Sequence, residues 1–293
     1  MQLIANIFVF LFIAGSLIPV DDQEIVQDKT EHRSKYLEVV ENLAGLDTRD
    51  PLFTAKCMRL GESNTTNSEL LALIDYMSIS SDESKALLQI AQEKRTTICL
   101  DDIVWNERGY FDFDLNFIVL KNSLTFPEKV LILVHELRHL DQYSRGFCPS
   151  TQFDISEHVR LTYALEADAQ AITTLSAWNM KENGYTTPWN ALMEFVNYSD
   201  ILNSFRTSLL ESQSLSTATN AAFAQWYHSP WRMESYYVSA CTSYLDDLDR
   251  SKMIQSYEKL PDSFFESLCS LPDGSNYECL KNSEIDFLGP LDE

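Results

Sequence analysis

The sequence predicts an α+β fold that is rich in helices, with a small sheet in the N-terminal half and a helical C-terminal half. β-Branched and aromatic residues gather in two runs, at 96–104 and 111–121, which favour strands. Apolar residues at helical spacing occupy much of the remaining chain. Strands first and helices after is the order typical of an α+β protein.

Local signals place the individual helices. Pro127 suits a first helical turn, because its φ is fixed and it has no N–H to leave unpaired, so a long helix is expected from there to Gly146 at the latest. Ser81 or Asp82 can cap an earlier helix. The expected helices are 34–45, 68–76, 82–94, 127–146, 156–180, 188–211, 216–228, 232–248 and a short one at 251–258.

The chain divides into four regions by composition and pattern. They are an apolar N-terminal segment (1–20), an N-terminal helical region (21–95), a central region that holds the strands and two long helices (96–180) and a helical C-terminal region (181–293). The 293 residues include 44 acidic and 22 basic side chains, a net charge of −22. Nucleic-acid binding depends on basic residues that face phosphates, so a nucleic-acid partner is not expected.

The N-terminal segment resembles an export signal. Its apolar core, residues 7–14, has the length of a secretory signal core and is short for a membrane span, and Ala14 and Ser16 offer a cleavage site. No basic residue precedes this core, so an uncleaved anchor or a buried helix stays open. We expect an exported protein, periplasmic, secreted or anchored at its N-terminus, that meets a membrane only through this segment.

Six cysteines fit an exported protein, since none lies in a CxxC pair that would suggest a zinc site. Up to three disulfides are then expected. Cys269 and Cys279 enclose a Pro-Asp-Gly turn and form the first candidate pair. Buried free thiols are the alternative.

The segment VLILVHELRHLDQ carries the chemistry. His135, Glu136 and His139 form an HExxH motif, in which the two histidines lie one helical turn apart and can bind one Zn²⁺ ion. Glu136 can then take a proton from a water molecule at the metal. The histidines interrupt an apolar helix, where polar groups are costly unless they are paired or ligated.

A catalytic zinc site needs a third protein ligand. The HExxHxxGxxH continuation is excluded, since Gln142 and Arg145 stand where it needs Gly and His. We predict Glu166, on the next helix, as the third ligand. Asp168 is predicted to accept the outer N–H of a ligand histidine, although the two acidic residues could exchange these roles.

The HELRH sequence, followed by Glu-Ala-Asp-Ala at 166–169, resembles the gluzincin branch of the zincin metallopeptidases, and more closely the metallopeptidase domains of bacterial genomes that carry HELRH…EADA. The resemblance covers residues 96–180. It implies that the strand near Phe117–Leu120 is an edge strand that holds an extended peptide substrate. Ala164 stands where better-known gluzincins often carry the ligand Glu.

Oxyanion stabilisation requires a further group, and His228 and Tyr236 are the candidates from an aromatic segment at 225–237. Core packing is the alternative for this segment. The sequence therefore predicts a zinc-dependent hydrolase, a metallopeptidase with a peptide or protein substrate. A non-catalytic envelope or secreted binding protein with a structural metal site is the competing interpretation.

Overall fold

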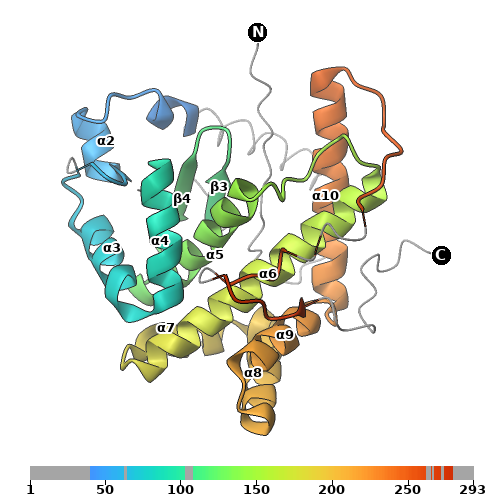
Figure 1. Ribbon diagram of the computed structural model, residues 1–293. Coiled ribbons are helices and arrows are strands. Elements are labelled where there is room, and N and C mark those ends of the chain that lie inside the picture. The colour runs from blue at the N-terminus through green and yellow to red at the C-terminus, as the bar shows by residue number, and fades with distance from the viewer. Residues whose placement is uncertain are drawn as a thin grey trace.

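The computed structural model of the protein describes residues 40–62, 65–102, 108–261, 265, 267–271 and 274–279 (Figure 1). The predicted signal or anchor segment lies outside these residues. The α+β fold class is confirmed: a small sheet lies in the N-terminal half and the C-terminal half is helical. The helices are α2 (Pro51–Lys56), α3 (Ser68–Ser80), α4 (Asp82–Lys94), α5 (Phe126–Ser144), α6 (Ile155–Glu182), α7 (Thr186–Glu194), the 3₁₀ helix η1 (Val196–Tyr198), α8 (Ser199–Ser212), α9 (Leu215–Trp226) and α10 (Pro230–Ser251).

The sheet has four strands in the order β1-β2-β4-β3. The central pair, β2 and β4, is parallel, whereas β1 and β3 each run antiparallel to their neighbour at the two edges. The strands are β1 (Cys57–Arg59), β2 (Thr97–Asp101), β3 (Gly109–Asp112) and β4 (Phe117–Lys121).

Alternation along β4 divides the apolar core in two. Ile118 and Leu120 point into the main cluster, which includes residues of α3 to α6 and of the C-terminal helices. Phe117 and Val119 point to the opposite face, where they join a smaller cluster with Phe53 of α2. The sheet is therefore covered on both faces, which explains why its strands read as continuous apolar runs.

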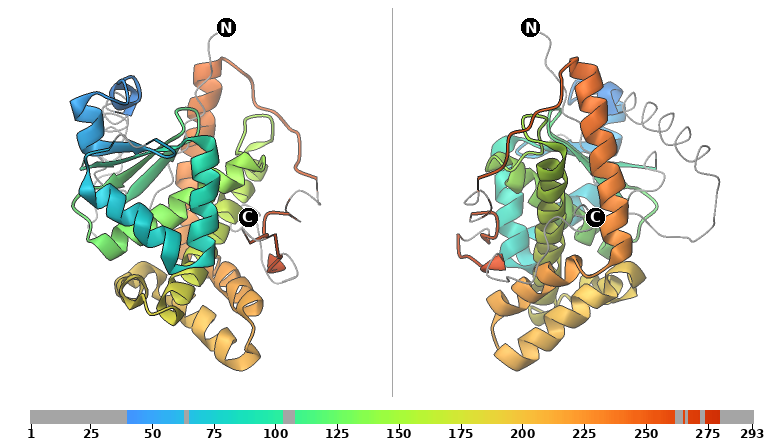
Figure 2. Two further views of the ribbon diagram at one scale, coloured as in Figure 1. Left: turned by 60° about the vertical axis from the view of Figure 1, so that its left-hand side comes forward. Right: turned by 90° about the vertical axis from the view of Figure 1, so that its right-hand side faces the viewer.

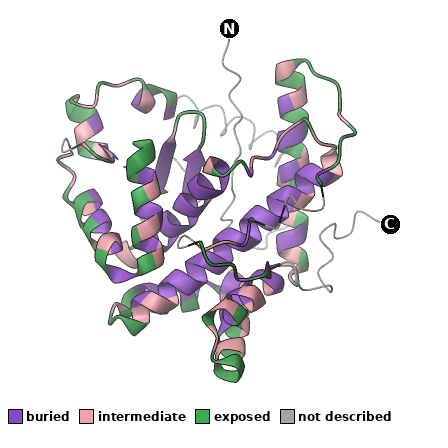
Figure 3. Cartoon of the chain, in the orientation of Figure 1, coloured by how far each residue is buried: buried purple, intermediate pink, exposed green. Residues whose placement is uncertain are grey.

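Two long helices form the centre of the molecule. Helix α5 begins after Thr125, whose backbone N–H donates to the Glu128 carboxylate (2.9 Å), and Pro127 lies in its first turn as predicted. Helix α6 begins after Asp154, whose carboxylate caps the N–H of Glu157 (2.9 Å). Most side chains of both helices are buried (Figure 3). Helix α10 packs against α6 on the side away from α3 and α4 (Figures 1 and 2).

Some predictions of single elements were wrong. The predicted helix 188–211 is divided into α7 and α8, because the chain leaves helical geometry at Phe195 (φ −77°, ψ 88°) where the Phe195 and Tyr198 rings are buried. The predicted helix 251–258 does not form: α10 ends at Ser251 and Lys252 takes a left-handed conformation (φ 54°). Helix α2 and strand β1 were not foreseen.

Two cysteine pairs lie at disulfide distance. Cys57 and Cys99 face each other across β1 and β2, and the predicted pair Cys269–Cys279 is confirmed. Cys148 and Cys241 carry free thiols. In the described part of the chain no helix combines the length and the apolar character that a membrane span requires.

Candidate metal centre

Three potential metal ligands meet between α5 and α6. His135 and His139 lie one turn apart on α5, and Glu166 faces them from α6, with one ligand atom of each within 4.8 Å of the others. The two histidine Nε2 atoms are 3.0 Å apart. Nε2 of His135 lies 3.6 Å from Oε2 of Glu166, and Nε2 of His139 lies 3.5 Å from Oε1. The two helices thus bring together the three residues that the sequence predicted as metal ligands.

The donor atoms lie close enough together for one small metal ion. Ligand atoms that each lie about 2.0–2.1 Å from a zinc ion are about 3.3 Å apart in a tetrahedral arrangement. The two Nε2 atoms are 3.0 Å apart, and each lies 3.5 to 3.6 Å from a different oxygen of Glu166, so the carboxylate turns one oxygen toward each histidine. Two imidazoles and one carboxylate are also a donor set that zinc takes in catalytic sites.

Burial controls the charge of these groups. The three side chains are at most 1% exposed. Burial lowers the pKa of His135 to about 3 and that of His139 to about 4, so both imidazoles are neutral and keep a lone pair for a metal. Burial raises the pKa of Glu166 to about 7. A bound cation would compensate the desolvation of this carboxylate.

Glu136 lies beside the ligands with its carboxylate unused. Both carboxylate oxygens are buried, and among the described residues neither has a hydrogen-bond partner. Burial, and then the charge of Glu166, raises the pKa of Glu136 well above its usual range. Strand β3 crosses directly over this side chain: a Cβ built on Gly109 would lie 3.0 Å from Oε1 of Glu136 and would clash with Ile132. The position therefore needs glycine.

The outer nitrogen of His139 is held by Gln142. Nδ1 of His139 lies 2.8 Å from the amide oxygen of Gln142. The amide nitrogen of Gln142 donates to the Leu165 carbonyl (2.9 Å) and to Asp168 (2.6 Å), and these two acceptors fix which end of the amide faces the histidine. His139 must therefore donate from Nδ1, which leaves the Nε2 lone pair directed toward the other ligands.

This arrangement corrects the role predicted for Asp168. Its carboxylate does not take the outer N–H of His139 directly, because the Gln142 amide stands between them. Asp168 instead accepts two hydrogen bonds from the Arg138 guanidinium, at 2.7 and 2.9 Å, and one from the Tyr277 hydroxyl at 2.5 Å. Arg138, from the HExxH segment, thus pairs with an acidic residue of α6.

The two candidates for oxyanion stabilisation lie in different surroundings. Tyr236, on α10, donates a hydrogen bond to Glu166, and burial, followed by the nearby Glu166 charge, raises the pKa of its hydroxyl well above the usual range. It also faces the hydroxyl of Tyr198. His228 lies after α9, where Nδ1 is 3.0 Å from the Ala224 carbonyl, and it is not part of the group that converges on the ligands.

The edge strand implied by the family resemblance was wrong. Strand β4, which contains Phe117–Leu120, is internal and pairs with both β2 and β3. The edge next to the HExxH helix is β3, whose residue Gly109 approaches Glu136.

The sequence did not identify Gln142 as the partner of His139, and it suggested no role for Tyr198 or Tyr277. Gln142 follows His139 by three residues and His135 by seven, so its helical spacing was the available signal. No local pattern marks Tyr198 or Tyr277, because each reaches the site from a separate part of the chain.

The fold and the site define a class of protein: a helix-rich α+β domain with a buried His-His-Glu group. Residues 52–279 match the family described as "Putative metallopeptidase family (DUF6782)", and the chain belongs to that family. No curated protein and no solved structure matches the chain.

Proposed function

We propose that the protein is a zinc-dependent metallopeptidase of the gluzincin type. The observation that carries the proposal is the convergence of His135, His139 and Glu166 at separations that one small ion can bridge, with the unpaired carboxylate of Glu136 beside them. Membership of a metallopeptidase family supports the same conclusion.

The chain supplies the metal ligands and their support. Nε2 of His135, Nε2 of His139 and the Glu166 carboxylate would hold the ion. Zinc, when bound, acidifies a water molecule and polarises the peptide carbonyl. Tyr236 orients the Glu166 carboxylate through its hydroxyl and stays protonated, so it acts as a hydrogen-bond donor.

Glu136 is the proton carrier. One of its carboxylate oxygens accepts the proton of the attacking water, and the same group then donates that proton to the nitrogen of the leaving amine. Burial raises the pKa of Glu136, which makes its carboxylate a stronger base toward the water proton than an exposed glutamate. We keep His228 as the proposed oxyanion donor; it lies apart from the metal ligands, so this role would require it to move from its contact with the Ala224 carbonyl.

We propose a peptide or protein substrate and an exported location. The two cysteine pairs at disulfide distance fit an oxidising compartment. The apolar N-terminal segment has the length of an export signal. The net charge of −22 disfavours a nucleic-acid partner.

One observation favours a second candidate function, a structural metal site in a non-catalytic exported protein. His135, Glu136, His139 and Glu166 are all at most 1% exposed. A peptide can therefore reach them only after part of the structure moves, whereas a structural ion needs no access. A structural site commonly has four protein ligands, and the group found among the described residues has three.

Glu136→Gln separates the two candidates. The variant keeps the three metal ligands, so it should bind zinc like the wild type whichever of the two functions is correct. A quenched fluorescent casein and a mixture of quenched peptides serve as substrates, with zinc content measured on the same samples. Hydrolysis by the wild type that falls at least about 10²-fold in Glu136→Gln supports the peptidase. Equal rates in the two zinc-loaded proteins would reject the assigned role of Glu136.

A further inference from the structure

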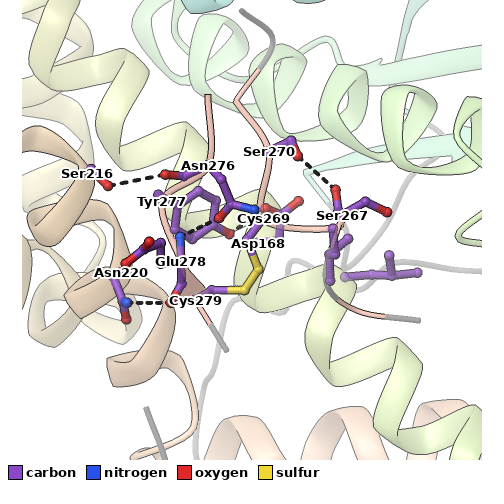
Figure 4. Close-up of a disulfide and its surroundings, with 12 residues drawn as sticks. Asp168, Ser216, Asn220, Ser267, Cys269, Ser270, Asn276, Tyr277, Glu278 and Cys279 are labelled. Atoms are coloured by element: carbon purple, nitrogen blue, oxygen red, sulfur yellow. Dashed lines mark hydrogen bonds between the residues drawn. A yellow bond between two sulfur atoms is a disulfide. The ribbon is translucent and has the colours of Figure 1, made fainter. Parts of the chain in front are cut away.

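A loop near the C-terminal end of the described chain is held by a disulfide and by hydrogen bonds to residues that lie next to the metal centre. Cys269 and Cys279 close it by a disulfide, and the Tyr277 N–H donates to the Cys269 carbonyl (3.0 Å) inside it (Figure 4). From α9, Asn220 donates to the Glu278 carbonyl (2.9 Å). We call the described residues 269–271 and 274–279 the disulfide loop.

The disulfide loop and its approach contact two buried charges between α5 and α6. The Tyr277 hydroxyl donates to Oδ1 of Asp168 at 2.5 Å, as Figure 4 shows. The Arg138 guanidinium donates to the carbonyl oxygens of Leu268 (3.0 Å) and Ser270 (2.7 Å). The backbone and one side chain of the loop thus complete the hydrogen bonding of an Arg–Asp pair that is wholly buried.

From this pair a chain of hydrogen bonds leads to a metal ligand. Oδ2 of Asp168 accepts from the Gln142 amide nitrogen (2.6 Å), and the Gln142 amide oxygen faces Nδ1 of His139 (2.8 Å). Three hydrogen bonds therefore separate the Tyr277 hydroxyl from the imidazole of His139. Each of these four residues is at most 1% exposed, so water does not compete for the contacts.

The disulfide controls where Tyr277 can lie. It ties the end of the loop that carries Tyr277 to the end that contacts Arg138, only 10 residues apart in sequence. Without the covalent link the loop ends would have more conformations available, and the hydroxyl would lie against Asp168 for a smaller part of the time.

We propose that the disulfide loop positions the metal ligand His139 through Tyr277, Asp168 and Gln142, so that metal affinity depends on the Cys269–Cys279 bond. This inference rests on the proposed metal centre and adds a device that couples it to the redox state of the compartment. Tyr277 is a positioning residue in this account. Partners of a ligand's outer hydrogen bonds commonly change metal affinity by about 10–100-fold when removed.

The test measures zinc affinity by competition with a chelator of known strength. The variants are Tyr277→Phe, which removes one hydroxyl, and Cys269→Ser/Cys279→Ser, which opens the loop. Serine is preferred to chemical reduction because free thiols themselves bind zinc. The matched controls are Tyr244→Phe, whose buried ring donates its hydroxyl to the Phe153 carbonyl (3.0 Å), and Cys57→Ser/Cys99→Ser. The visible spectrum of the Co²⁺-loaded proteins reports the ligand geometry.

We expect the zinc dissociation constant to rise about tenfold in both loop variants, with a changed Co²⁺ spectrum, and to change less than about twofold in the controls. If the opened-loop protein does not fold, Tyr277→Phe alone decides. Tight zinc binding by the wild type that is equal in Tyr277→Phe, or an equal loss in the controls, overturns this inference and leaves the metal centre standing. A wild type that binds no zinc overturns both.

Discussion

The amide oxygen of Gln142 lies 2.8 Å from Nδ1 of His139 and is held there because the amide nitrogen has two acceptors on α6. This relationship determines the tautomer of His139, a proposed metal ligand, from outside the proposed ligand set. It also explains why an amide can be buried in an apolar helix, because the nitrogen and the oxygen of Gln142 both have hydrogen-bond partners within the protein.

Gln142→Leu should weaken zinc binding by about 10–100-fold. Leucine has a similar volume but leaves the outer N–H of His139 without an acceptor and frees its ring to turn. Zinc titration against a competing chelator measures the loss. Gln225→Leu, which removes an amide that donates to Asp200 (3.0 Å) away from the metal centre, is the control. Equal affinity in the wild type and Gln142→Leu would show that the amide does not support the ligand.

Gly109→Ala should lower the free energy of unfolding by about 1–3 kcal/mol. The added methyl group would clash with Ile132 and come within 3.0 Å of the Glu136 carboxylate. Chemical denaturation measures the change. Ile132→Ala removes the clashing group, so the cost of Gly109→Ala should be smaller in that background. Strictly additive effects of the two substitutions would contradict the close approach of β3 to α5.

Arg138→Met should destabilise the fold by about 3–5 kcal/mol, because it leaves the Asp168 carboxylate buried with its main charge partner removed. Urea unfolding measures this cost. Arg49→Met is the contrasting variant: Arg49 pairs with Asp47 in the open, so its loss should have no measurable effect. Similar stabilities for Arg138→Met and the wild type would mean that the buried pair is not formed.

His158 should make the protein less stable in mild acid. Burial lowers its pKa to about 4, whereas the unfolded chain takes up the proton near pH 6.5, so the unfolded state binds more protons between these values. The contribution of the neutral ring is complete above pH 6.5 and is lost as the pH falls toward 4, amounting to about 2 kcal/mol between pH 7 and pH 5.

His158→Phe keeps an aromatic ring against Tyr244, with which His158 makes an edge contact at 5.2 Å between centroids. The free energy of unfolding at pH 7 and pH 5 should therefore differ less in the variant than in the wild type. The other histidines are common to both proteins and cancel in this comparison. Parallel pH profiles for the two proteins would refute the assignment.

Local signals in the sequence were sufficient for much of the fold. The β-branched runs gave β2 and β4, and Pro127 with the apolar periodicity gave α5 and α6, since these depend on residues near each other in the chain. Strand β1 has three residues and forms only through pairing with β2, 38 to 42 residues away. No local pattern in the sequence therefore predicts it. Strand order is equally nonlocal, which is why β4 was wrongly placed at the edge.

In the candidate site, too, the residues that lie near one another in the chain could be predicted and the distant ones could not. The HExxH spacing nominated His135, Glu136 and His139 because one helix carries all three. Which side chain reaches the outer nitrogen of His139 depends on how α5 and α6 are aligned, so the sequence predicted Asp168 where the structure places Gln142. Tyr277 lies 109 residues beyond Asp168, and only the folded structure brings the two together.

The central claim, a zinc site made of His135, His139 and Glu166, is tested most directly by the zinc content of purified protein. Elemental analysis of the wild type beside His139→Ala and Glu166→Ala, each shown to be folded by circular dichroism, gives the comparison. We expect close to one zinc ion per wild-type chain and a clear loss in both variants. A folded wild type that takes up no zinc when it is supplied, or a Glu166→Ala protein that retains it fully, would contradict this site.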